Sequence, residues 1–371
     1  MSATYLLDGV SAAAESSSVL APTSPPSTPA RGAKGHSDAI WGIKWANRAG
    51  GGQVVVSASA DHSLKIWNPA APSAPARTVR PRKSLGIVGL DVDKDPNGAA
   101  FFVSNSIDSV VTRYAIDGVE QARTQLGPAE SWALSLHPTA PVVATAGNDA
   151  KVKVLNAAAE GFGDPLATYE ASGTFGSAVR YSIGGGYLAV ASDTGYVTLF
   201  DSQTGALVST FPAHSAPIRS VSFTSNLLVT ASDDKRVNVF DLRALTAAST
   251  RSGGAGAGAG STSRRGQVAS LGGHEGWVVS VEARNDRLLA SGSADGTVKL
   301  FDLAAPSSAL ATLRDHSGDV WALAWAPDGT TTTAGAPQVD GLGGASAGLG
   351  GGRLASAGED GAIRWWRGGG S

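Results

Sequence analysis

The sequence contains no cysteine, which excludes disulfide bonds, zinc ribbons, iron–sulfur sites and thiol catalysis. Charged residues make up only 16% of it, against about 25% in an average domain. Lys and Arg (29) nearly balance Asp and Glu (31), so no strong basic field attracts nucleic acid. No apolar run approaches the roughly 18 residues of a membrane helix, and the N-terminus lacks a signal-peptide pattern. We therefore expect an intracellular protein that contacts neither membranes nor nucleic acid directly.

Glycine and proline, by contrast, are plentiful, with 48 and 18 of 371 residues. The hydrophobic share is 42%, while aromatic residues make up 6%. This composition favours many short strands joined by tight turns over a helical bundle.

One ten-residue pattern, SADGTVKLFD at 293–302, recurs along the chain. Close copies are SADHSLKIWN, SDDKRVNVFD and GEDGAIRWWR, and weaker copies are GNDAKVKVLN, SIDSVVTRYA and SDTGYVTLFD. The aligned turn positions of the seven copies are Asp61, Asp108, Asp149, Thr194, Asp234, Asp295 and Asp360. They are separated by 47, 41, 45, 40, 61 and 65 residues. Without the low-complexity stretches 249–266 and 330–352, which we interpret as inserted loops, the two long intervals fall to 43 and 42 residues.

A period of about 40–45 residues with four strand signals is typical of one β-propeller blade. The last repeat has only three strands, and we expect the β-like segment 4–10 to supply the fourth and close the ring. Residues 11–35, rich in Pro, Ser and Ala, would form a linker to the first blade. The sequence thus predicts a single all-β, seven-bladed propeller domain over 1–371, with seven repeats in 36–367.

Four repeats share a polar set: a histidine before the first strand, a Ser or Thr in the second, an aspartate in the next turn, and an aromatic residue in the third. The histidines are His36, His214, His274 and His316, and the aspartates are Asp61, Asp234, Asp295 and Asp360. Ser, His and Asp also make up a hydrolase triad, but a triad is needed once and this set occurs four times. We interpret the set as structural and expect no catalytic residues, no metal and no cofactor.

A second set directly follows the leading apolar residue of each first strand, where side chains should emerge at the central opening of one face. These residues are Trp41, Val88, Trp132, Ser177, Arg219, Val279 and Trp321. Three tryptophans in one ring are unusual for a surface that meets only water. With Trp277 and the acidic Asp38 and Asp319, they would form a protein-binding face for a peptide carrying an arginine and an apolar residue. The alternative is that the tryptophans pack between blades as core.

The repeats resemble those of the WD40 family over essentially the whole chain, from Thr4 to Arg367. Within that family, four segments are similar to the WD40 subunits of superkiller complexes. They are HSDAIWGIKWA (36–46), LLVTASDDKRVNVFDLR (227–243), GGHEGWVVSVEARNDRLLASGSADGTVKLFDL (272–303) and IRWWR (363–367). The fourth repeat departs from the family pattern, with Thr194 in place of the aspartate and no leading histidine. The second and third repeats also lack the histidine.

This resemblance implies a non-catalytic scaffold bound to the tetratricopeptide-repeat subunit of the superkiller (Ski) complex, beside its RNA helicase. That complex assists exosome-mediated 3′→5′ mRNA decay in the cytoplasm. Relatives also act in the nucleus, with a meiotic double-strand-break protein in recombination or with the polymerase-associated factor complex, which implies a cytoplasmic and nuclear location. One alternative is another WD40 adaptor, such as a ubiquitin-ligase substrate receptor or a histone-peptide reader. A third interpretation is a propeller enzyme. The residues expected at the central opening argue against it, because they are mostly Trp, Val and Ser.

Overall fold

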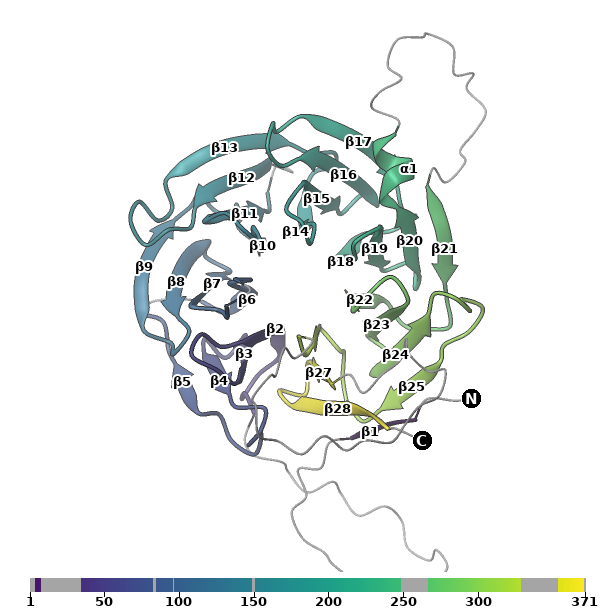
Figure 1. Ribbon diagram of the computed structural model, residues 1–371, viewed down its shortest axis with the longest axis horizontal. Coiled ribbons are helices and arrows are strands. Elements are labelled where there is room, and N and C mark those ends of the chain that lie inside the picture. The colour runs from purple at the N-terminus through teal and green to yellow at the C-terminus, as the bar shows by residue number, and fades with distance from the viewer. Residues whose placement is uncertain are drawn as a thin grey trace, which may run out of the picture.

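The computed structural model describes residues 4–7, 35–82, 85–95, 97–148, 151–247, 266–327 and 353–369, and of residues 4–7 it describes the backbone alone. Seven four-stranded antiparallel sheets stand around a central axis (Figure 1). The predicted seven-bladed, all-β propeller is therefore confirmed. Residues 8–34, Asp149, and the inserts at 249–265 and 330–352 lie outside the described residues.

In each of the first six blades, four consecutive strands run from the centre to the rim (Figure 1). Blade one contains β2 (Ile40–Asn47), β3 (Gln53–Ser59), β4 (Leu64–Trp67) and β5 (Arg77–Val79). Blade two contains β6 (Ile87–Val92), β7 (Phe101–Ser106), β8 (Val110–Ala115) and β9 (Glu120–Gln125). Blade three contains β10 (Ala133–Leu136), β11 (Val142–Ala146), β12 (Lys151–Asn156) and β13 (Pro165–Glu170).

Blade four contains β14 (Gly176–Tyr181), β15 (Tyr187–Ser192), β16 (Tyr196–Asp201) and β17 (Leu207–Pro212). Blade five contains β18 (Ile218–Phe223), β19 (Leu227–Ser232), β20 (Val237–Asp241) and β21 (Gln267–Leu271), with the short helix α1 (Leu242–Thr246) after β20. Blade six contains β22 (Val278–Ala283), β23 (Leu288–Ser293), β24 (Thr297–Asp302) and β25 (Ala311–Arg314). Within the described ranges, no helix has the length and apolar character needed to cross a membrane.

Blade seven combines the two ends of the chain. Its strands are β26 (Ala322–Trp325), β27 (Arg353–Ala357), β28 (Ile363–Gly369) and, at the rim, β1 (Thr4–Leu7). β1 pairs antiparallel with β28, from Thr4 opposite Gly369 to Leu7 opposite Trp366. The N-terminal strand therefore closes the ring as predicted, because it covers the edge of β28 that would otherwise stay unpaired.

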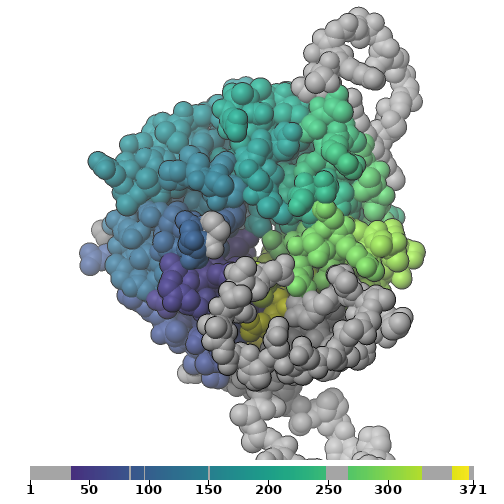
Figure 2. Space-filling view, viewed as in Figure 1, coloured from purple at the N-terminus to yellow at the C-terminus, as the bar shows by residue number. Residues whose placement is uncertain are grey.

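The apolar core lies between neighbouring blades, which pack closely side by side (Figure 2). Between blades seven and one, for example, the Trp45 and Trp365 rings meet edge to face with centroids 5.5 Å apart. Strands buried on both faces explain the nearly continuous apolar runs of the second strands, such as β19, where five of six residues are buried. Because each blade packs against its two neighbours, the seven inner strands are held around one axis.

The turn between the second and third strands has a common geometry. Its aspartate accepts backbone N–H groups, as when Asp61 Oδ1 accepts from the Ser63 N–H at 2.9 Å. The residue after the aspartate adopts a positive φ, which glycine provides freely at Gly296 (φ 75°). His62 and Lys235 hold the same conformation at φ 63° and 69°. His62, which stands apart from the four leading histidines, therefore belongs to a turn.

Each of the four leading histidines joins its loop to this turn. His36 Nδ1 lies 2.9 Å from Asp61 Oδ2, and its Nε2 lies 2.8 Å from Ser57 Oγ. The Trp67 indole N–H donates to the same serine oxygen at 2.9 Å. The corresponding pairs in blades five, six and seven are His214 with Asp234 and Thr230, His274 with Asp295 and Ser291, and His316 with Asp360 and Ser356. These chains of hydrogen bonds fix the loops that lead into four of the inner strands.

Burial keeps two of these histidines, His36 and His274, neutral. It lowers the pKa of His36 from its usual 6.5 to about 4, and it also lowers the pKa of His274. Burial alone would raise the pKa of Asp61, but hydrogen bonds from the Ser63 hydroxyl, the Ser37 backbone N–H and the His36 ring lower it to about 2. A neutral His36 can donate a hydrogen bond from Nδ1 to the aspartate and accept a hydrogen bond from the Ser57 hydroxyl at Nε2.

We expect the free energy of unfolding to fall as the pH drops from about 6.5 toward 4. In this window the unfolded chain binds protons on histidines that the folded chain keeps neutral, so protonation favours unfolding. The measurement is urea unfolding at a series of pH values. His36→Gln removes one of these titrating groups and should show a shallower pH dependence; a slope equal to that of the wild type would contradict this account.

Candidate functional site

The inner strands carry a β-bulge at the same place in five blades. In β2 the register shifts between Ile40 and Gly42, which leaves Trp41 outside the ladder. The residues at the corresponding shifts in β6, β14, β18 and β22 are Val88, Ser177, Arg219 and Val279. A bulge bends its strand and redirects the side chain of the extra residue. In blades three and seven, Trp132 and Trp321 stand directly before β10 and β26.

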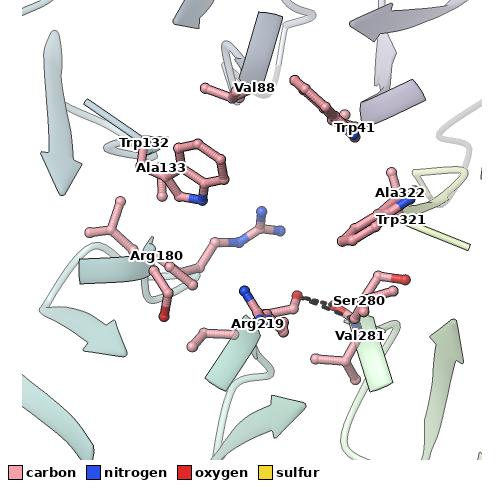
Figure 3. A pocket seen from close by; sticks show the side chains of 18 of the residues that line it. Trp41, Val88, Trp132, Ala133, Arg180, Arg219, Ser280, Val281, Trp321 and Ala322 are labelled. Atoms are coloured by element: carbon pink, nitrogen blue, oxygen red, sulfur yellow. Dashed lines mark hydrogen bonds between the residues drawn. The ribbon is translucent and has the colours of Figure 1, made fainter. Parts of the chain in front are cut away.

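These seven residues line one central cavity of about 660 Å³. The structure thus brings together every residue that the sequence placed at the central opening. Trp41 and Trp321 lie on one side of the cavity and Trp132 lies across from them, while Arg180 and Arg219 reach toward the middle (Figure 3). We call Trp41, Trp132 and Trp321 the aromatic mouth.

The aromatic mouth is accessible. Trp132 is 41% exposed, and Trp41 and Trp321 are half-buried. The buried tryptophans are instead Trp45, Trp67, Trp325, Trp365 and Trp366. The three tryptophans of the mouth therefore differ from those that pack between blades.

Further apolar side chains extend the mouth on its blade-two and blade-four sides. The Phe175 ring meets the Trp132 ring edge to face at 5.8 Å between centroids. Gly86 packs beneath Trp41 and Ile107, since a Cβ there would lie 3.3 Å from a carbon of each side chain. Ile107 is itself exposed. Phe175 and Ile107 were missed in the sequence because they lie in loops, where no strand period marks the direction of a side chain.

The other residues predicted for this face lie beside the cavity and not in its lining. Trp277, Asp38 and Asp319 stand in the loops that lead into β22, β2 and β26, at the same end as the tryptophans. Trp277 is 51% exposed and Asp38 is exposed. Burial and the neighbouring Glu359 carboxylate raise the pKa of Asp319. The acidic residues therefore form an edge next to Trp321.

Charged side chains line the cavity beyond the tryptophans. The Arg219 guanidinium pairs with Asp233, with Nη2 2.6 Å from Oδ2. Arg180 Nη2 lies 2.7 Å from Glu282 Oε1, so an ion pair connects β14 with β22, two blades away. Arg180, Glu282 and Lys44 each stand three residues after one of the seven residues at the central opening, which are Ser177, Val279 and Trp41 respectively. This deeper charge was not predicted, because the bulge shifts the inward-facing positions away from a simple alternation.

Among the residues that the structure describes, no group of three His, Asp or Glu side chains is placed to hold a metal ion. What the cavity offers is an aromatic rim, one acidic edge and a charged interior. Such a surface suits the capture of a peptide side chain.

Comparison with known proteins gives one family and several relatives. The family model described as "WD domain, G-beta repeat" matches residues 28–68, 205–241, 265–302 and 307–367. WD repeat-containing protein SL1-17 of Schistosoma mansoni is 29% identical over 215 residues, which cover 56% of this chain and 68% of that protein. Meiotic recombination protein rec14 of Schizosaccharomyces pombe is 27% identical over 117 residues, 31% of this chain and 38% of that protein.

WD repeat-containing protein slp1 of the same yeast is 28% identical over 155 residues, 42% of this chain and 28% of that protein. The segments that match the family model fall on blades one, five, six and seven. These are the four blades that carry the full polar set.

Proposed function

From the premise that this chain belongs to the WD40-repeat family, we propose that it is a non-catalytic scaffold whose aromatic mouth captures a short segment of a partner protein. The observation that carries the proposal is the ring of three accessible tryptophans around an open cavity. Folded proteins seldom leave such a cluster facing only water, and interface energy concentrates in aromatic anchors.

The charges around the mouth support a segment with one basic and one apolar residue. Trp41 and Trp321 lie near each other, on the side of the ring where β2 and β26 adjoin. The acidic pair Asp319 and Glu359 stands beside them, and burial together with the Glu359 carboxylate raises the pKa of Asp319. An arginine of the partner would stack on the indole faces and pair with these carboxylates. Asp38 adds a further acidic group on this side.

The apolar residue would lie on the opposite side, against Trp132 and Phe175. The chain's own arginines, Arg180 and Arg219, belong to blades four and five. Each of these arginines is already paired with a carboxylate of the chain, Glu282 or Asp233, so the apolar rings of Trp132 and Phe175 set the direction of the bound segment.

For the assembly, we propose the superkiller complex, with the tetratricopeptide-repeat subunit as the direct partner and the RNA helicase beside it. The role would be to assist exosome-mediated 3′→5′ mRNA decay in the cytoplasm. Similarity to a protein named for meiotic recombination supports a second, nuclear role with a double-strand-break protein. The polymerase-associated factor complex is the other nuclear partner that we propose, which gives the protein a place in both compartments.

The test is affinity purification of the tagged full chain from native extract, followed by mass spectrometry. We expect the helicase and the tetratricopeptide-repeat subunit with the wild type and a loss of both with Trp321→Ala. Leu207→Ala is the matched control, because Leu207 is an apolar residue, 58% exposed, on the outer strand β17. Recovery of cullin adaptors or histones without the helicase would contradict the proposal and favour another WD40 adaptor.

A further inference from the structure

A cluster of five charges lies around the interior of the cavity, and its charges do not balance. Asp91 pairs with Lys94 at 3.1 Å, and Arg180 pairs with Glu282 at 2.7 Å. Lys44 is the fifth member and interacts electrostatically with the other four. Two ion pairs and one additional cation leave the cluster with one positive charge in excess.

The Lys44 ammonium group has no direct partner among the described residues. It lines the cavity from β2, and within the described part of the chain it makes no hydrogen bond and no ion pair. Burial and the positive charges of Arg180 and Lys94 lower its pKa, while Glu282 and Asp91 oppose this effect. Lys44 is half-buried in the wall of the cavity, where the surrounding protein strengthens the attraction between a cation without a counter-ion and an anion from solution.

Arg180 offers donors at the same place. Its Nη2 donates to Glu282, while its other guanidinium nitrogens donate no hydrogen bond to any described residue. The guanidinium lies in the middle of the cavity (Figure 3). Lys44 and Arg180 therefore line the same cavity, interact electrostatically with each other, and each carry N–H groups that donate to no described residue.

We propose that a small carboxylate ion binds in the cavity between Lys44 and Arg180. One negative charge neutralises the excess charge of the cluster, and a planar carboxylate suits the fork of a guanidinium. A phosphate dianion would reverse the sign of the imbalance instead of removing it. The site lies deeper than the aromatic mouth and requires no bound peptide, so it goes beyond the proposed function.

The test uses reductive methylation of the lysines in the full chain, read by mass spectrometry, in acetate and in chloride at equal ionic strength. Bound acetate covers Lys44 and favours its protonated, unreactive form. The rate at which Lys44 is methylated should fall about tenfold when the acetate concentration reaches about ten times its dissociation constant, because protection scales with 1 + [L]/Kd. Lys151, which is exposed on β12, should react equally in both salts and is the internal control.

Two variants separate this site from a general salt effect. Acetate should raise the melting temperature of the wild type and of Lys151→Met but not that of Lys44→Met. If Lys44→Met does not fold, the labelling of the wild type decides alone. Unchanged Lys44 reactivity in acetate, or an equal thermal shift in Lys44→Met, would overturn the proposal. Stronger protection by phosphate than by acetate would overturn the assignment to a carboxylate.

Discussion

Deletion of residues 1–10 is expected to lower the melting temperature and to promote aggregation. The deletion removes β1, so the outer edge of β28 loses its antiparallel partner along Thr4–Leu7. Each ladder hydrogen bond contributes about 1 kcal/mol, and an unpaired strand edge is a template for association with other chains. The measurement is differential scanning calorimetry combined with light scattering.

A matched deletion distinguishes ring closure from a general effect of shortening the chain. Removal of residues 249–265 should be nearly neutral, because it keeps Gly266, whose carbonyl accepts the Asp241 N–H, and because the closure entropy of a flexible loop depends only weakly on its length. A melting temperature that is unchanged without residues 1–10 would contradict the role of β1 in stability.

Replacement of Trp41 or Trp321 by alanine is expected to weaken partner capture at least about tenfold, which corresponds to about 1.4 kcal/mol. Both indoles face the cavity, and truncation of a buried aromatic anchor commonly costs 2 kcal/mol or more. The measurement is a titration of the purified variants with the C-terminal region of the tetratricopeptide-repeat partner.

Two controls make the result of these substitutions interpretable. Leu207→Ala removes an exposed apolar residue far from the cavity in the fold and should bind as the wild type does. Circular dichroism reports folding, which should survive because neither tryptophan belongs to the buried core. Wild-type affinity in both variants would move the binding site off this face, and unfolding of both would show that they are needed for packing.

The seven blades could be predicted because the repeat is carried by strand periodicity and turn chemistry, which do not depend on the histidine. The family model leaves residues 69–204 unmatched, yet blades two to four have the same four-stranded sheets as the others. The sequence differences between these three blades and the family pattern appear in the structure as local differences in hydrogen bonding. In blade three, for example, the Thr145 hydroxyl stands where Ser57 stands in blade one and has no hydrogen-bond partner among the described residues.

The candidate site could be predicted only in part. The positions of Trp41, Trp132 and Trp321 followed from their place after the first apolar residue of each repeat. The charged interior could not be predicted in this way. The bulge places Lys44, Arg180 and Glu282 three residues after the positions at the central opening. In addition, no local pattern shows that an ion pair joins blades four and six. Loop side chains such as Asp38 were expected beside the tryptophans, but their exact direction depends on packing that the sequence does not encode locally.

The most direct test of the scaffold account is amide hydrogen exchange of the full chain, with and without the C-terminal region of the tetratricopeptide-repeat partner. The account predicts slower exchange at the beginnings of β2, β10 and β26, where the aromatic mouth lies, and unchanged exchange in the outer strands β13 and β17. Protection confined to the outer strands, with none around the mouth, would contradict it.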